Sequence, residues 1–145
     1  SLMLSKVCES LTPNGVIVIA IENRFGRKYL CGAGEDHYSI PFEGINNYPN
    51  YSGIKTWSQN EWEELLGEVG LQFQFHYPFP DYKLPVVIIN NDYLVRNHNA
   101  WCHLQGIVSR DYHGQIDPQD DLTFWKNVHH QGSLSAFSTL FAYLA

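Results

Sequence analysis

The feature around which the chain is organised is a continuous apolar run at residues 16–21. It follows Gly15, and Glu22 and Asn23 come directly after it. A short run of this kind, rich in β-branched residues, is typical of a strand buried on both faces, in the middle of a parallel or mixed sheet that helices cover. Ligands of open α/β sheets bind beyond the carboxyl ends of strands, so Glu22 and Asn23 are the first candidates for a functional site.

Apolar residues at helical spacing predict helices before and after this strand. Four such residues near the N-terminus are Leu4, Val7, Cys8 and Leu11. They predict a helix that the turn at 12–15 would end. Later, Ser58 and Glu61 form a capping-box pattern, and Gly70 stands where a helix C′ residue is expected. The apolar face between them is Trp62, Leu65, Leu66 and Val69.

The second half of the chain predicts further strands and one more helix. Residues 71–77 alternate apolar and polar side chains, and 86–89 form a short run that we expect to be extended. The Pro-rich segment 78–85 is not expected in a helix interior or a central strand. Asp117 and Pro118 suit the start of a helix through about residue 128. Apolar residues after Gly132 fit a helix and a strand equally well.

The segment 24–55 lacks both periodicities and contains many glycine and aromatic residues. A connection of this length is uncommon in a compact domain unless it binds a ligand or is disordered. Its aromatic content argues against disorder. We therefore expect an ordered, functional insertion at the carboxyl end of the strand.

Composition limits the classes of function. The formal charge of −6 and the lack of a Lys/Arg run argue against a nucleic-acid groove. No stretch approaches the length of a membrane span. Three widely spaced cysteines indicate free thiols in a reducing, cytoplasmic compartment. The 145 residues suit one domain or a piece of one, and both ends look cut, so residues 1–145 are interpreted as a single domain or a domain fragment.

Several segments carry a family resemblance. A Leu-Thr-Pro-Asn-Gly turn, the buried strand and a capped helix ending in Glu-Val-Gly-Leu resemble the C-terminal half of a class I S-adenosylmethionine-dependent methyltransferase, where they lead into the fifth and sixth strands. More specific segments resemble a subfamily found in bacterial surface-polysaccharide or lipopolysaccharide biosynthesis, often beside glycosyltransferase domains. They are 19–26, 32–37, 41–45, 55–58 and 77–85. The resemblance covers about residues 1–90, and 93–145 is a weakly assigned extension in whose tail a closing strand is expected.

The resemblance implies an α/β fold, a partial Rossmann-like methyltransferase sheet with flanking helices and a long insertion after the central strand. It implies S-adenosylmethionine as cofactor of the intact parent protein, and a saccharide or sugar-nucleotide acceptor. The family's Gly-rich cofactor turn has no counterpart here, because Gly32-Ala33-Gly34 neither follows a strand nor starts a helix. The chain would then be the substrate-side half, inactive alone, and a half sheet with an open edge is expected to form a homodimer.

The loop residues Glu35, Asp36 and His37 are the catalytic candidates. A His beside a carboxylate can remove a proton from an acceptor hydroxyl, with His37 or Asp36 as the base. The alternatives are a solvated acidic turn and, less favoured, a metal site, since three adjacent residues rarely face one ion. We expect no metal here.

The substrate-binding candidates lie at two strand ends. Glu22 and Asn23 either face the reaction crevice or are a solvated carboxylate and a turn cap. In the Pro-stiffened loop, Tyr82 would stack on a sugar ring, with Asp81 and Lys83 beside it, or Tyr82 would simply cover the core. A rival function is a non-catalytic module of a polysaccharide synthase that binds carbohydrate or another domain.

Overall fold

The computed structural model describes residues 2–107 and 118–144. Its elements, in chain order, are α1 (Leu2–Glu9), β1 (Ile17–Ile21), α2 (Arg27–Leu30), α3 (Gln59–Glu68), β2 (Phe73–Phe79), β3 (Val87–Asn90), α4 (Asn91–Arg96), the 3₁₀ helix η1 (Ala100–Leu104), α5 (Pro118–His130), α6 (Leu134–Phe137) and β4 (Leu140–Leu144). The fold is therefore mixed α/β, as expected. None of the helices in these ranges is both long and apolar enough to cross a membrane.

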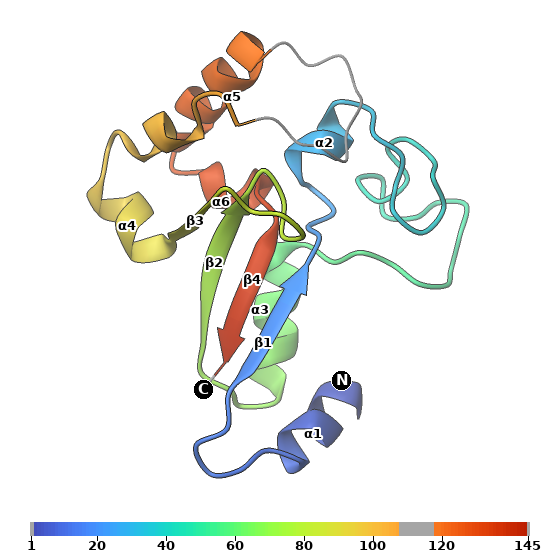
Figure 1. Cartoon of the computed structure of the whole chain (residues 1–145). Coiled ribbons are helices and arrows are strands. Elements are labelled where there is room, and N and C mark those ends of the chain that lie inside the picture. Colours follow the sequence, from blue (N-terminus) through green and yellow to red (C-terminus); the bar gives the residue numbers. More distant parts are fainter. Residues whose placement is uncertain (1, 108–117, 145) are drawn as a thin grey trace.

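The four strands form one sheet in the order β1-β4-β2-β3, and every neighbouring pair is antiparallel. The tail strand β4 lies between β1 and β2, with Ala142 opposite Ile19 on one side and Phe75 on the other (Figure 1). β1 and β2 consequently run in the same direction. The tail, whose spacing fitted a helix and a strand, forms the short helix α6 and then this strand, because only a strand can pair with both neighbours.

The expectation that β1 is central in a parallel or mixed sheet and buried on both faces is wrong for the described residues. β1 is an edge strand, and its side chains alternate: Ile17, Ile19 and Ile21 pack on the core, whereas Val18 is 66% exposed. Helix α3 covers the face on which the isoleucines lie, and Figure 1 shows the opposite face of β1, β4 and β2 without a helix in front of it. An apolar run shows that a strand tolerates burial on both faces, but it does not supply the second covering layer.

The capping box that starts α3 is confirmed. The Glu61 amide donates to Ser58 Oγ at 3.3 Å, and the Ser58 amide donates to Glu61 Oε2 at 2.7 Å. Trp62 and Leu66 of this helix are buried against the sheet, as the spacing predicts. The same core cluster extends to Leu4, Phe75, Tyr77, Phe79, Ile89, Leu94, Ala100, Leu104, Trp125 and Leu134.

Pro78 corrects a second expectation, because it lies inside β2, an interior strand, opposite Ile88 of β3. The missing N–H is tolerated since the β4 pairing of β2 ends at His76, two residues earlier. Beyond that point the Thr139 hydroxyl donates to the Pro78 carbonyl at 3.0 Å and replaces a backbone partner. A proline therefore fits where one ladder of the strand has already ended.

Helix α5 confirms the helix predicted from Pro118, and Trp125 is its buried anchor. The proposed N-cap Asp117 lies outside the described residues. The weakly patterned stretch before it contains α4 and η1, whose Leu94, Ala100 and Leu104 join the core. The first predicted helix is shorter than expected: α1 ends at Glu9, before Leu11, and Val7 is exposed.

Candidate functional site

Three charged residues meet where β1 ends. Glu22, only 4% exposed, follows the last residue of β1. Its Oε1 accepts a hydrogen bond of 2.8 Å from the Nζ of Lys28 in α2, and the same ammonium donates to Asp36 Oδ1 at 3.3 Å. Helix α2 turns back over the strand end, so Lys28 joins a buried carboxylate to one nearer the surface. We call Glu22, Lys28 and Asp36 the charged cluster.

The second carboxylate oxygen of Glu22, Oε2, is buried and has no hydrogen-bond partner. Leaving a buried acceptor unpaired costs about 1–3 kcal/mol, more when it is charged. Such an atom can accept a hydrogen bond from a water molecule or from a hydroxyl of a ligand. The Tyr29 hydroxyl is also buried, close to Asp36 but without a well-formed hydrogen bond.

Burial and mutual charge set the protonation states of this cluster. Burial raises the pKa of Glu22, and the Lys28 ammonium offsets this only in part. Burial alone would lower the pKa of Lys28, but Glu22 and Asp36 outweigh it and raise that pKa. Burial and the same carboxylates raise the pKa of the Tyr29 phenol. Lys28 thus remains an ammonium and Tyr29 a neutral hydroxyl, so neither is a base.

The Pro-rich loop after β2 comes close to this cluster. Burial, and then the charges of Glu22 and Asp36, raise the pKa of the Tyr82 phenol, while the Lys83 ammonium favours the ionised form of Glu22. Asp81 is buried, and its Oδ1 accepts the amides of Lys83 at 2.7 Å and Leu84 at 3.2 Å. Asp81 therefore shapes the loop, and Tyr82 and Lys83 are loop residues whose side chains interact electrostatically with the charged cluster.

Asn23 has a structural environment. It is fully buried, its Nδ2 donates to the carbonyls of Ala136 at 2.8 Å and Ser138 at 2.9 Å, and its Oδ1 accepts the Phe25 amide. Both polar atoms of the amide are therefore in use. Of the two residues predicted at the end of β1, Glu22 alone has a buried side-chain oxygen without a hydrogen-bond partner.

The loop residues predicted as catalytic are separated by their environments. Glu35 is buried, and its carboxylate accepts four hydrogen bonds, two of them from the amides of His37 and Tyr38. The other two come from the hydroxyls of Tyr48 and Thr56. The His37 side chain is exposed, and Asp36 belongs to the charged cluster. Glu35 holds the insertion together, which explains why a long loop can be ordered.

Lys28 and Tyr29 are site residues that sequence reasoning missed. The signal available was Gly26, which stands at the N-cap of α2 five residues after the end of β1. A glycine there allows a short helix to fold back over the strand end, since a Cβ at this position would lie 2.9 Å from the Asn23 carbonyl. Four helical residues are too few for periodicity to reveal.

The glycines of the insertion do not form a cofactor cradle. A Cβ on Gly34 would lie 2.8 Å from the Ser39 carbonyl, and Gly34 forms an isolated bridge with Pro41, so this glycine lets the loop close on itself. Among the described residues, Gly34 therefore serves the loop itself and offers no backbone cradle for S-adenosylmethionine. Within the described ranges no three His, Cys, Asp or Glu side chains are grouped as metal ligands would be.

Comparison with family models, with curated proteins and with solved structures finds no match to this chain.

Proposed function

We propose that this chain is the acceptor side of an S-adenosylmethionine-dependent methyltransferase that acts on a saccharide or sugar-nucleotide precursor of a surface polysaccharide. The observation that carries the proposal is the unpartnered Glu22 Oε2 at the carboxyl end of β1. A neutral polyol has the donors that this oxygen lacks. The charged cluster would hold one acceptor hydroxyl, with Tyr82 and Lys83 of the neighbouring loop beside it.

The sheet supports the proposal independently of the charged cluster. The resemblance to the methyltransferase family predicts two strands joined by a capped helix, and a closing strand in the tail. β1, α3 and β2 follow one another in this way, and β4 closes the sheet between the two strands. The charged cluster lies at the end of β1 where ligands of α/β sheets bind.

The proposal assigns binding and orientation to this chain. Lys28 keeps Glu22 Oε1 occupied, so that Oε2 is the oxygen that receives the acceptor hydroxyl. S-Adenosylmethionine, which supplies the methyl group, would be held by a part of the parent protein outside this chain. The chain alone is therefore expected to be inactive.

The test uses isothermal titration of S-adenosylhomocysteine into this chain and into the chain with its natural upstream sequence. Binding by the longer protein alone is expected. Methyl transfer from labelled S-adenosylmethionine to a panel of nucleotide sugars is then measured in that protein. Glu22→Gln should abolish transfer and leave S-adenosylhomocysteine binding unchanged, whereas Glu9→Gln, at an exposed carboxylate, should alter neither. Binding by neither protein would refute the proposal and favour a non-catalytic carbohydrate-binding module.

A further inference from the structure

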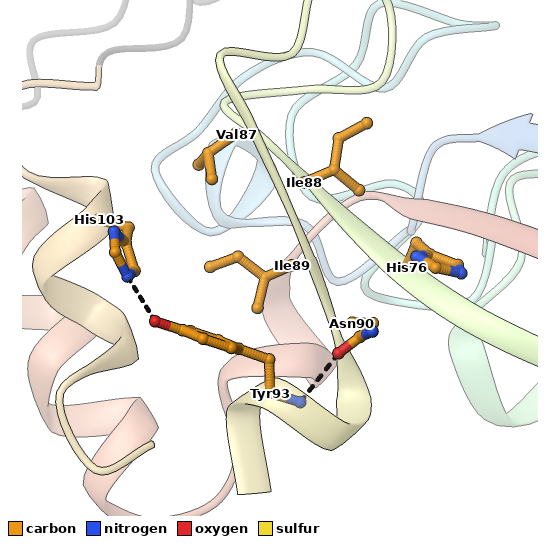
Figure 2. A pocket seen from close by; sticks show the side chains of 7 residues that line it. All are labelled: His76, Val87, Ile88, Ile89, Asn90, Tyr93 and His103. Atoms are coloured by element: carbon orange, nitrogen blue, oxygen red, sulfur yellow. Dashed lines mark hydrogen bonds between the residues drawn. The ribbon is translucent and has the colours of Figure 1, made fainter. Parts of the chain in front are cut away.

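A pocket of about 330 Å³ lies along the outer edge of β3, in the size range of small-molecule sites. Figure 2 shows Val87 and Ile89 on one side of the β3 ribbon, toward Tyr93 and His103. Ile88 lies on the other side, together with His76 of β2. Aliphatic side chains thus line the strand edge, and a phenol and two imidazoles surround it.

Tyr93 is a wall of this pocket that is fixed at both ends (Figure 2). Its hydroxyl shares a hydrogen bond of 2.7 Å with His103 Nε2, and its backbone amide donates to Asn90 Oδ1 at 2.8 Å. Asn90 is the N-cap of α4, so the capping interaction also positions the aromatic ring. The ring is therefore oriented before any ligand arrives, which reduces the entropy lost on binding.

The backbone of Ile88 offers a donor and an acceptor to the pocket. Ile88 lies opposite Pro78, which has no N–H and whose carbonyl accepts a hydrogen bond from Thr139, whereas the next carbonyl, that of Phe79, accepts from the Val86 amide before β3. Residue pairs in an antiparallel ladder alternate between hydrogen-bonded and non-hydrogen-bonded pairs. The missing N–H of Pro78 and the direction of its carbonyl indicate that Pro78 and Ile88 are a non-hydrogen-bonded pair. The N–H and C=O of Ile88 then point away from β2, toward the free edge.

The lining selects the class of ligand. It includes no Asp, Glu, Lys or Arg, so no carboxylate, ammonium or guanidinium group compensates the desolvation of a charged ligand. An extended peptide added to the edge is disfavoured as well, because β3 has four residues and α4 begins immediately after it. A rigid ring needs only the one donor–acceptor pair of Ile88 and an aromatic wall.

We propose that the β3-edge pocket binds a planar, uncharged heteroaromatic ring of the nucleobase type. The ring lies against Tyr93 and the aliphatic side chains, and its polar edge pairs with the backbone N–H and C=O of Ile88. This inference does not depend on the methyltransferase proposal, because the pocket shares no residue with the charged cluster.

The test is saturation-transfer-difference NMR on this chain with adenosine, guanosine, cytidine and uridine at millimolar concentration. At least one nucleoside is expected to bind, with stronger saturation on base than on ribose protons. Ile88→Lys should abolish the signal, while Val95→Lys, at an exposed residue of α4 that does not line the pocket, should preserve it. Tyr93→Ala should weaken binding about tenfold, on the scale of base–aromatic stacking, and Tyr93→Phe by less.

Circular dichroism tests whether each variant is folded. If either Ile88→Lys or Tyr93→Ala is unfolded, the conclusion is drawn from the other of these two variants. The absence of a signal from all four nucleosides would overturn the proposal. So would a signal that persists unchanged in folded Ile88→Lys and Tyr93→Ala. Glu22→Gln should leave nucleoside binding intact, which separates this test from that of the charged cluster.

Discussion

Asn23 Nδ2 donates a hydrogen bond of 2.9 Å to the carbonyl of Ser138, 115 residues later in the chain. This bond ties the end of β1 to the segment that leads into β4, directly beside the charged cluster. The tie is buried, and the Ala136 carbonyl shares the same amide. The position of Glu22 therefore depends on a contact between the two ends of the chain.

Asn23→Ala should lower the free energy of unfolding by about 2–3 kcal/mol, because it leaves buried carbonyls without a donor. Urea denaturation measures the change, and Asn14→Ala, at an exposed asparagine, is the matched control. An unchanged free energy of unfolding together with lost acceptor binding would instead identify Asn23 as a ligand-binding residue.

Glu35→Gln should destabilise the chain by about 1–3 kcal/mol, since the amide NH₂ cannot accept the bonds that one carboxylate oxygen receives. His37→Ala should change stability by less than about 0.5 kcal/mol, because the ring is exposed. Thermal unfolding of both variants checks this pair. If His37→Ala abolished methyl transfer in the intact parent protein while Glu22→Gln did not, the base would be His37, as the sequence suggested.

Lys28→Met should be more damaging at pH 8 than at pH 5. The substitution leaves Glu22 buried without its cation, a loss on the order of 3 kcal/mol when the carboxylate is ionised. The raised pKa of Glu22 in the folded state means that the folded chain takes up a proton more readily than the unfolded one, so the penalty diminishes as pH falls. Chemical denaturation of the wild type and of Lys28→Met between pH 5 and pH 8 measures this loss of stability.

The controls for the Lys28 experiment are the double variant Glu22→Gln/Lys28→Met, which should recover most of the lost stability, and Lys6→Met at an exposed lysine. A Lys28→Met penalty that does not change between pH 5 and 8 would show that Glu22 is not the group involved.

Glu61 makes α3 sensitive to acid. Burial alone would raise its pKa, but hydrogen bonds from Ser58 and the charges of Arg24 and Lys55 lower it below the model-compound value of 4.5. A depressed pKa in the folded state stabilises the chain above the unfolded pKa, and this contribution is lost as pH falls through the folded value. Glu61→Gln retains a capping box, so its stability should approach that of the wild type as pH falls from 4.5 through the lower, folded pKa of Glu61. A difference in the free energy of unfolding between the wild type and Glu61→Gln that stays the same at every pH would contradict this prediction.

The open face and outer edge of β1 predict self-association of the isolated chain. Val18 on this strand and Val16 directly before it are exposed, and among the described residues β1 pairs on one side only. Light scattering should show a mass that rises with protein concentration. Val18→Lys should reduce the rise, and Val95→Lys should not. A constant monomer mass at the highest attainable concentration would contradict the prediction.

The sequence alone determined the local elements whose signals lie within a few residues. The capping box of Ser58 and Glu61, the apolar face of α3 and the start of α5 each depend on neighbours at helical spacing. Alternation predicted β2 for the same reason. The position of Glu22 at a strand end was also predictable, since it is the first polar residue after an apolar run.

Only the tertiary structure decided what each element faces. The tail became a strand because β1 and β2 both offered it backbone partners, and Pro78 fits in β2 because the β4 ladder ends before it. Lys28 reaches Glu22 through a four-residue helix, and Glu35 is occupied by donors up to 21 residues away. Burial and hydrogen bonding between distant segments leave no periodic pattern in the chain, so the difference between the open oxygen of Glu22 and the saturated carboxylate of Glu35 exists only after folding.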